Sequence, residues 1–299
     1  MDKVCFVILH YISFKDTVEC INTIIGNIKY NNYNIIIIDN KSPNNSGNLL
    51  KKKYKDDNII KVILNNHNLG FANGNNIGYE YARNVLKADY IIFLNNDTII
   101  KQSEFLNKVI NIYHETRYYV LGPDIISLKN NLHQNPQRLK GLKKYEVKKL
   151  ISFFRLIYIK DTLLYITKSY DFMRKLKKIL KKMLHKENKT NNVNYVDNNL
   201  IQENVQLHGA CLIFSPLYIE KFEYGLYPET FMYMEEDILY YLCRKNNFKT
   251  LYDPNIVIYH KEDASTDAFL NSTLQKRRFI SKNSIKSAKV LYKLMKKEF

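Results

Sequence analysis

A group of polar side chains, Asn95-Asn96-Asp97-Thr98, directly follows the apolar run at 90–94. Such an unbroken apolar run is typical of a strand that is buried on both faces, as in a parallel sheet. Open α/β sheets bind ligands beyond the carboxyl ends of their strands, where a carboxylate can hold a divalent cation together with a diphosphate. The same residues also form good turns. Taken alone, the segment therefore predicts either a metal site or a simple turn.

Two other predicted strands also end in polar residues. The run at 34–38 is followed by Asp39-Asn40, and the run at 59–64 by an Asn- and Gly-rich loop at 65–74. Apolar residues at helical spacing separate the strands, and one helix is expected over about 75–86. This alternation predicts βαβ units in a parallel sheet, whose strand ends share one edge. The predicted fold class is α/β, with a nucleotide crevice at that edge.

Three glycines, Gly70, Gly74 and Gly78, recur at a spacing of four residues. This spacing differs from the G-x-G-x-x-G pattern of dinucleotide-binding loops. Glycines at this spacing allow a helix to pack closely on a sheet, and that interpretation competes with ligand binding, most evenly at Gly78.

The second half of the chain adds a second group of residues that could bind a ligand, exchange a proton or hold a metal. A predicted strand near 206–214 contains the small residues Gly209-Ala210, which favour a close approach of backbone and ligand. Glu235-Glu236-Asp237 then opens a helix, a position that the helix dipole favours. Short strands are expected at 248–252 and 256–259. The second ends at His260, a candidate ligand for a metal at Asp97.

The composition narrows the possible partners. Lys and Arg number 46 against 29 Asp and Glu, a formal net charge of +17. This balance favours nucleic acid, anionic membrane or phosphorylated small molecules as partners. The excess is concentrated at 137–190 and 275–299. The lysines at 175–182 suit either a basic amphipathic helix on anionic lipid or an ordinary solvated insertion. A basic membrane- or nucleic-acid-binding module without enzymatic activity thus stays open as a second class.

The sequence predicts neither a membrane-spanning segment nor a signal peptide. No stretch approaches the roughly 20 apolar residues that span a bilayer, and the apolar run at 4–9 is too short for a signal peptide. The four cysteines form no close pair of metal-ligand type, which fits a reducing compartment. We expect a cytoplasmic protein, either free or peripheral on the inner face of the plasma membrane.

Together these motifs resemble family 2 of the inverting glycosyltransferases, and most closely the rhamnosyltransferase-like branch of bacterial surface-polysaccharide synthesis. The motifs that carry the resemblance lie at 37–42, 68–78, 94–98, 209–212, 235–237, 260–261 and 265–266. The match covers about 3–128 and 206–266. One departure is that Asn95 replaces the first Asp of the DxD metal motif, which leaves Asp97 as its only carboxylate. A nucleotidyltransferase is disfavoured because no Gly-rich basic loop follows the first predicted strand.

The resemblance implies a GT-A fold, in which a Rossmann-like and mostly parallel central sheet is flanked by helices. On this basis 1–128 forms the nucleotide-sugar-binding half and 206–266 the acceptor-binding and catalytic half. A basic helical insertion at 129–205 connects the two halves, and a basic helical extension follows at 267–299.

The resemblance also assigns roles to individual residues. Nucleotide-sugar contacts fall on His10, Tyr11, Asp39, Asn40, Asn68, Gly70, Asn73, Asn76 and Asn96. Asp97 and His260 would hold Mg²⁺ or Mn²⁺, and acceptor contacts fall on Gly209, Ala210 and Glu235. The catalytic base would be Asp237, which is preferred, or Glu236.

The substrates that the resemblance implies are a donor and a glycan acceptor. The donor would be dTDP-rhamnose or a UDP-hexose. The acceptor would be a glycan or a polyprenyl-diphosphate-linked glycan in O-antigen or capsule synthesis.

Overall fold

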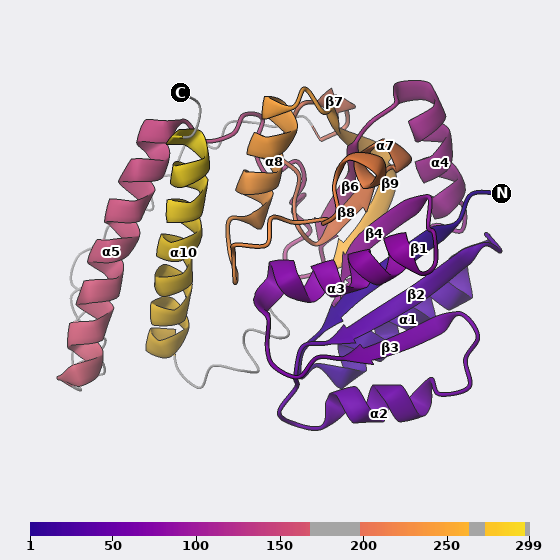
Figure 1. The fold of residues 1–299 in the computed structure, drawn as a ribbon, viewed down its shortest axis with the longest axis horizontal. Helices are drawn as coiled ribbons and strands as arrows, with labels where there is room; N and C mark the ends of the chain where they lie inside the picture. The colour runs from indigo at the N-terminus through magenta and orange to yellow at the C-terminus, as the bar shows by residue number, and fades with distance from the viewer. Residues whose placement is uncertain (168–197, 263–272, 297–299) are drawn as a thin grey trace.

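The computed structural model describes residues 1–167, 198–262 and 273–296 (Figure 1). Within these residues, a nine-stranded mixed sheet forms the centre of the molecule, in the order β3-β2-β1-β4-β8-β6-β9-β5, and β7 pairs with β9. The α/β fold class that the sequence predicts is confirmed.

Strands and helices alternate through the first half of the chain. The strands are β1 (Val4–His10), β2 (Tyr33–Asp39), β3 (Ile60–Leu64), β4 (Tyr90–Asn95), β5 (Thr98–Ile99), β6 (Val120–Ser127), β7 (Gln202–Glu203), β8 (Cys211–Phe214) and β9 (Thr250–His260). The helices are α1 (Phe14–Asn27), α2 (Ser46–Lys53), α3 (Gly70–Asn84), α4 (Phe105–Thr116), α5 (Lys144–Ile166), α7 (Pro216–Lys221), α8 (Glu235–Lys245) and α10 (Thr273–Lys296).

The first four strands are parallel, and their register aligns their carboxyl ends. His10 of β1 lies opposite Asp39 of β2, and Leu9 lies opposite Asn95 of β4. β8 then runs antiparallel to β4 and β6, whereas β9 runs parallel to β6. The polar residues that follow β1, β2 and β4 therefore meet at one edge of the sheet, as the sequence predicts.

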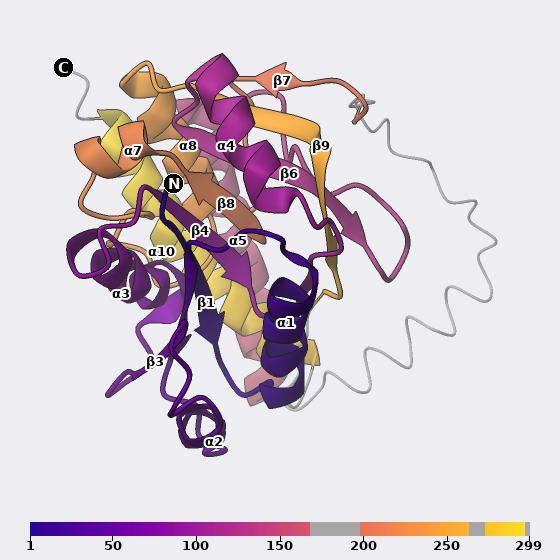
Figure 2. The ribbon, with the colours of Figure 1, turned by 90° about the vertical axis from the view of Figure 1, so that its right-hand side faces the viewer.

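Helices cover both faces of this sheet (Figure 2). On one face, α1 and α4 bury residues such as Ile24 and Val109 against the sheet. On the other face, α3 and α7 contribute Tyr79 and Tyr218. Strands that are covered on both sides must be apolar at every position, which explains the fully buried run of isoleucines in β2.

Two of the three recurring glycines let α3 lie close to the sheet. A Cβ at Gly78 would stand 2.3 Å from a methyl group of Val7, and a Cβ at Gly74 would stand 2.6 Å from Leu9. Both distances are too short for any larger residue. At these two positions, the packing interpretation is the one that the structure supports.

Helices α5 and α10 lie side by side at the far end of the molecule from α1 and α2 (Figure 1). They join α8 in a separate apolar cluster that includes Ile151, Ile238, Leu291 and Met295. None of the described helices is both long and apolar enough to cross a membrane.

The structure corrects two expectations about elements. The two strands expected at 248–252 and 256–259 form one strand, β9, because it pairs with β6 on both sides of an irregularity between Pro123 and Asp124. The loop expected at 65–74 ends early, since α3 begins at Gly70. The lysines at 175–182 and the motif at 265–266 lie outside the described residues.

Candidate active site

Asp97 and His260 are 163 positions apart in the sequence numbering but adjacent in space. The short strand β5 pairs Thr98 with His260 of β9, and the backbone N–H of Lys261 donates to the carbonyl of Asp97 at 3.0 Å. As a result, Nε2 of His260 lies 3.2 Å from Oδ1 of Asp97. The structure thus brings together the two residues that the sequence analysis assigns to a metal.

The imidazole of His260 is held in place from its other side. Its Nδ1 lies 2.8 Å from Oε1 of Gln134, and Nε2 of Gln134 donates to Glu262 at 2.8 Å. A partner on one ring nitrogen fixes the orientation of the other. Gln134 was not among the predicted site residues, because an isolated Gln between predicted elements carries no pattern.

The donor set fits a divalent cation that also binds a ligand. Among the described residues, no group of three or more His, Cys, Asp and Glu side chains is arranged to hold a metal. Asp97 and His260 offer one carboxylate and one imidazole. Mg²⁺ usually takes one or two protein ligands and completes its shell with waters and phosphate oxygens. The pair therefore suits a cation bound together with a diphosphate.

His10 and Asp39 meet at the ends of β1 and β2, but His10 is not open to a ligand. The ring of His10 is fully buried, with its nitrogens 2.7 Å from the hydroxyl of Thr17 and 2.8 Å from that of Ser46. Burial lowers its pKa to about 4, so the ring is neutral at pH 7. In this structure His10 links the end of β1 to α1 and α2, and its contact with a nucleotide stays a prediction.

Asp39 closes a tight turn at the same edge. Its carboxylate accepts the backbone N–H of Ser42 at 3.2 Å. A Cβ at Gly47 would lie 2.2 Å from Oδ2 of Asp39, so only glycine leaves room for this carboxylate. Tyr11 lies beside this turn and is hydrogen-bonded to Asn68, and burial raises its pKa. Among these predicted nucleotide contacts, Asp39 is buried, Tyr11 is partly exposed and Asn68 is exposed.

The side chain of Asn40 is engaged by the protein at both ends. Its amide nitrogen donates to Oδ1 of Asn68 at 3.0 Å and to the carbonyl of Gly70 at 2.9 Å. Its oxygen accepts the backbone N–H of Leu69 at 2.9 Å and the amide of Asn65 at 3.2 Å. Asn40 therefore clamps the end of β2 to the start of α3.

The asparagines of α3 point to a distant part of the chain. Asn76 donates to the carbonyl of Leu226 at 2.7 Å and accepts the N–H of Gly225 at 3.1 Å. Asn73 donates to the carbonyl of Pro228 at 2.8 Å. Both amides therefore find partners in the segment that leads to α8.

Gly70 and Asn96 also make close contacts within the protein at the ends of the strands. Gly70 has a φ of +79°, and a Cβ there would lie 2.0 Å from the carbonyl oxygen of Phe231. The same carbonyl accepts the N–H of Phe71. Asn96 turns inward and donates to the hydroxyl of Thr17 at 2.9 Å. Gly70 thereby fixes the start of α3, and Asn96 fixes the turn after β4.

The acidic residues form the first turn of α8. Glu236 is partly exposed, and its carboxylate lies against Gly209, where a Cβ would stand 2.4 Å from Oε1. Next to Gly209, the ring of His208 lies 5.9 Å from that of His260, centroid to centroid. Residues 208–209 thus connect the acidic turn with the Asp97–His260 pair. His208 was not among the predicted site residues.

The three carboxylates differ in their surroundings. Glu235 is 3% exposed, and burial together with the charge of Glu236 raises its pKa to about 8. Burial raises the pKa of Glu236 to about 6, although the N–H of Gly209 and Arg138 stabilise its charged form. The pKa of Asp237 is also raised by burial, against the opposing effect of Arg138. Glu236 is the least buried of the three.

Asp237 forms an ion pair with Arg138. Nη1 of Arg138 lies 2.5 Å from its Oδ1, and the backbone around Arg138 pairs with Gln206 just before β8. Arg138 was not predicted, because a single Arg in a basic segment gives no signal. Two residues expected to contact the acceptor, Ala210 and Glu235, are almost completely buried. Gly209, the third of that predicted set, is also buried, and it lies against the carboxylate of Glu236.

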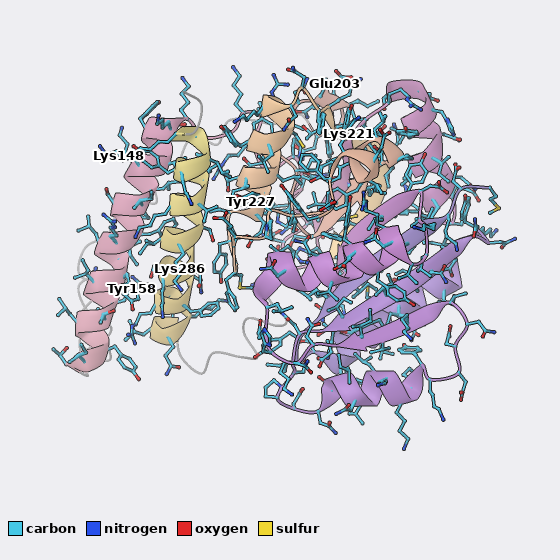
Figure 3. All side chains as sticks on the ribbon, in the orientation of Figure 1. Lys148, Tyr158, Glu203, Lys221, Tyr227 and Lys286 are labelled. Atoms are coloured by element: carbon cyan, nitrogen blue, oxygen red, sulfur yellow. The ribbon has the colours of Figure 1, made fainter. Side chains whose placement is uncertain are left out.

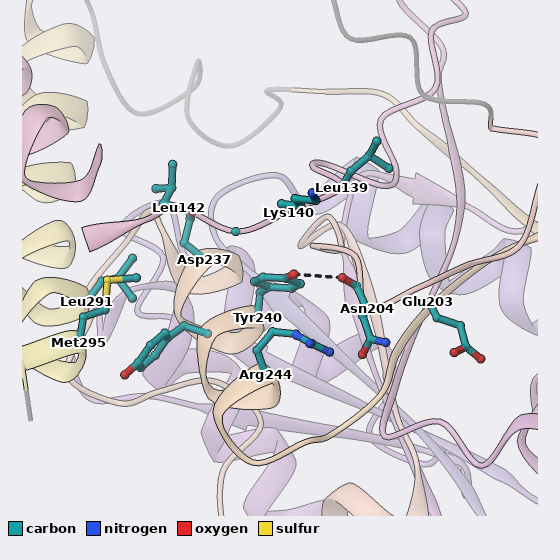
Figure 4. A pocket seen from close by; sticks show the side chains of 12 residues that line it. Leu139, Lys140, Leu142, Glu203, Asn204, Asp237, Tyr240, Arg244, Leu291 and Met295 are labelled. Carbon is teal, nitrogen blue, oxygen red and sulfur yellow. Dashed lines mark hydrogen bonds between the residues drawn. The ribbon is translucent and has the colours of Figure 1, made fainter. Parts of the chain in front are cut away.

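A cavity of about 550 Å³ lies beside the acidic turn (Figure 4). Asp237, Tyr240 and Arg244 of α8 line one side, and Lys140 lies across from them. The other lining residues are Leu139, Gly141, Leu142, Glu203, Asn204, Tyr241, Leu291 and Met295. The hydroxyl of Tyr240 donates to the carbonyl of Asn204 at 3.0 Å.

The charges around this cavity are not balanced. Glu203 pairs with Lys249 at 3.0 Å and Asp237 with Arg138, and neither of these cations lines the cavity. Within the described part of the chain, the two cations that do line it, Lys140 and Arg244, have no ion-pair partner. The cavity therefore favours an anionic ligand.

Comparison with known proteins gives the family. The model of glycosyl transferase family 2 matches residues 5–185. The low-salt glycan biosynthesis hexosyltransferase Agl10 of Haloferax volcanii is 22% identical over 294 residues, which cover 97% of this chain and 78% of that protein. Glycosyltransferase GlyG of Streptococcus pneumoniae is 31% identical over 93 residues, 31% of this chain and 29% of that protein.

Solved structures support the same fold. S. aureus TarS 1–349 aligns over 87% of this chain and 60% of that chain, with a TM-score of 0.53 and 12% identity. Its complex with UDP aligns over 93% and 65%, with a TM-score of 0.52 and 12% identity. This chain thus spans less than two thirds of those TarS chains, and the likeness concerns the fold. Because the family model covers more than half of its residues, the chain belongs to glycosyl transferase family 2.

Proposed function

We propose that this chain transfers a sugar from a nucleoside diphosphate sugar to a hydroxyl group of a glycan, with inversion at the anomeric carbon. The observation that carries this proposal is the spacing of two groups along one edge. The Asp97–His260 pair can hold a diphosphate-bound cation, and residues 208–209 connect it to the partly exposed carboxylate of Glu236. A donor and an acceptor held between them would meet at that edge.

The donor would bind at the edge formed by the ends of β1, β2 and β4. Asp39 and Tyr11 would meet the base, and the diphosphate would lie at Asp97 and His260 with Mg²⁺ or Mn²⁺. The cation would offset the charge that builds on the leaving diphosphate. The complex of S. aureus TarS with UDP supports a uridine nucleotide, so a UDP-hexose is the first donor to test. dTDP-rhamnose is the alternative.

Glu236 is the proposed general base. With a pKa of about 6 it is mostly deprotonated at pH 7, and it stays basic enough to accept a proton. The acceptor oxygen forms a bond to the anomeric carbon as the bond from that carbon to the diphosphate oxygen breaks. The acceptor proton passes to Glu236, and the diphosphate leaves with the bonding electrons. Asp237, which the sequence analysis prefers, is assigned an orienting role because Arg138 already binds it.

The acceptor would approach from the side of α8. The cavity next to Asp237 carries two unpaired cations and an apolar wall that includes Leu291 and Met295. These features support a glycan acceptor that bears a phosphate, such as a polyprenyl-diphosphate-linked glycan. The description of Agl10 as a hexosyltransferase of glycan biosynthesis supports the same class of product. A place in O-antigen or capsule synthesis is part of this proposal.

A panel of nucleotide sugars tests the proposal. Purified protein is incubated with each donor and Mn²⁺, and release of the nucleoside diphosphate is measured with and without short phosphorylated glycosides. We expect release from at least one donor, faster when an acceptor is present. Failure of every donor to bind or react would count against the transferase and in favour of a basic binding module.

A further inference from the structure

Helix α5 exposes a row of large apolar side chains on the side that faces away from α10. Its members are Phe153, Leu156, Ile159, Leu163 and Ile166, which are 56–69% exposed. They recur at intervals of three or four residues, so they lie along one side of the helix. From Phe153 to Ile166 the row is about 20 Å long at 1.5 Å per residue.

The opposite side of α5 is already used. Val147 and Ile151 are buried in the cluster with α8 and α10. Further along, Asp161 pairs with Arg277 of α10 at 3.0 Å, and the guanidinium of Arg278 stacks on Tyr165 at 4.3 Å. A helix that is apolar on both sides is normally covered on both sides. The described part of the chain covers only one.

Cations border the exposed row on both margins. At 100° per residue, Leu156, Ile159 and Leu163 form the centre of the row. Lys148 and Arg155 fall on one side of this centre, near the line of Ile166, and Lys149 and Lys160 fall on the other, near the line of Phe153. All four side chains are exposed, and Lys148 projects from α5 in Figure 3. Among the described residues, none of the four forms an ion pair with a carboxylate.

The two acidic residues of α5 do not offset this charge. Asp161 is fully buried against α10. Glu146 lies in the first turn and accepts the backbone N–H of Lys143 at 2.6 Å. The outward face of α5 therefore combines an apolar centre with margins of one charge sign.

This charge discriminates between the possible occupants of the face. A second copy placed face to face would bring like charges together. Residues 168–197 of the same chain hold nine Lys and Arg against three Asp and Glu, so they too would repel it. An anionic lipid surface offers opposite charge at the margins and an apolar interior for the row, the pattern of helices that lie in the plane of a membrane.

We propose that the outward face of α5, defined by the row and its four bordering cations, binds the surface of a membrane that contains anionic lipid. Phe153, Leu156 and Leu163 would enter the boundary between head groups and acyl chains. The cations would remain at the level of the lipid phosphates. If the proposed function holds, this contact would also keep the enzyme at the membrane, where a lipid-linked acceptor resides.

Vesicle cosedimentation with the full chain tests this surface. Vesicles of phosphatidylglycerol and phosphatidylcholine in equal parts are compared with pure phosphatidylcholine. We expect binding to the anionic vesicles that weakens as salt is raised, and little binding to the neutral ones. The paired changes Leu156→Asp with Leu163→Asp and Lys148→Gln with Arg155→Gln should each weaken binding by about tenfold or more.

A matched control uses exposed apolar residues elsewhere, Leu49→Asp with Val85→Asp, and these should leave binding unchanged. Unaltered binding of both α5 variants would overturn the proposal. So would a dimer that the Leu156 and Leu163 changes dissociate in light scattering, or a large drop in Tm that shows the face to be covered within the chain. Release of nucleoside diphosphate from a soluble donor is measured in parallel. A variant that loses vesicle binding but keeps this release shows that the membrane contact and the proposed function fail independently.

Discussion

The two ends of the candidate site are built in different ways. On the donor side, the polar residues after β1, β2 and β4 are largely satisfied by one another and by α3, as Asn40 illustrates with its four hydrogen-bond contacts. In the first turn of α8, burial raises the pKa of three consecutive carboxylates, and Arg138 stabilises the charged forms of two of them, Glu236 and Asp237. The edge proposed to bind the donor is thus a hydrogen-bonded frame, whereas the turn proposed to face the acceptor holds three carboxylates whose pKa values are raised by burial.

Several residues that the resemblance assigns to the donor are hydrogen-bonded within the protein. The side-chain amide of Asn76 donates to the carbonyl of Leu226, and that of Asn96 donates to the hydroxyl of Thr17. Preorganisation of this kind lowers the cost of binding a ligand without touching it. The acceptor side instead keeps Glu236 partly exposed next to Gly209.

The largest expected effect comes from removing the proton acceptor. Glu236→Gln keeps the shape of the side chain and should lower kcat by about 10²–10⁴-fold, the usual contribution of a general base. Asp237→Asn should cost less, because it weakens the contact with Arg138 and leaves Glu236 in place. Steady-state rates of nucleotide release measure both. A larger loss in the Asp237 variant would reverse the assignment of the base.

The pH dependence should follow Glu236. A base works when deprotonated, so kcat/KM should rise with pH through about 6 and level off above it. Arg138 stabilises the charged form of this carboxylate, and Arg138→Gln should therefore move the rising limb to higher pH. If kcat/KM rises at the same pH in this variant as in the wild type, Arg138 does not affect the pKa of the group that titrates.

The donor frame can be tested through stability. Gly78→Ala places a Cβ about 2.3 Å from Val7, and overpacking of this kind should destabilise the fold by roughly 1–3 kcal/mol. Gly26→Ala is the matched control, since nothing lies within 4 Å of its Cβ, and it should be neutral or stabilise by about 0.5 kcal/mol. Urea unfolding compares the two. Equal free energies of unfolding for the two variants would show that α3 can move away from Val7 at little cost.

The smallest effect concerns Glu235, whose pKa is raised to about 8 by burial. The folded state holds this proton up to higher pH than the unfolded chain does, so its contribution to stability is lost as pH rises from about 4.5 to about 8. Glu235→Gln removes that loss and should raise Tm at pH 8.5 by at least about 2 °C relative to its effect at pH 5. A shift of equal size at both pH values would contradict a buried, titrating Glu235.

The sequence predicts the parts of this molecule that depend on local pattern. Buried strands followed by polar residues predict the shared edge, and the position of His260 at the end of a strand predicts its approach to Asp97. The partners of Asn73 and Asn76 were not predictable, because an amide bonds to whichever backbone group tertiary packing brings near. The choice between Glu236 and Asp237 depends on a turn of 100° between successive helix positions, which resemblance to a motif does not resolve.

The central claim is that the edge holding Asp97 and His260 binds and activates a nucleoside diphosphate sugar. The most direct measurement is release of nucleoside diphosphate from the best donor by the wild type and by Asp97→Ala, with Mn²⁺ and with EDTA. We expect turnover to require the metal and to be lost in Asp97→Ala, while Tm stays within a few degrees. Full turnover in EDTA or in the Asp97→Ala variant would contradict it.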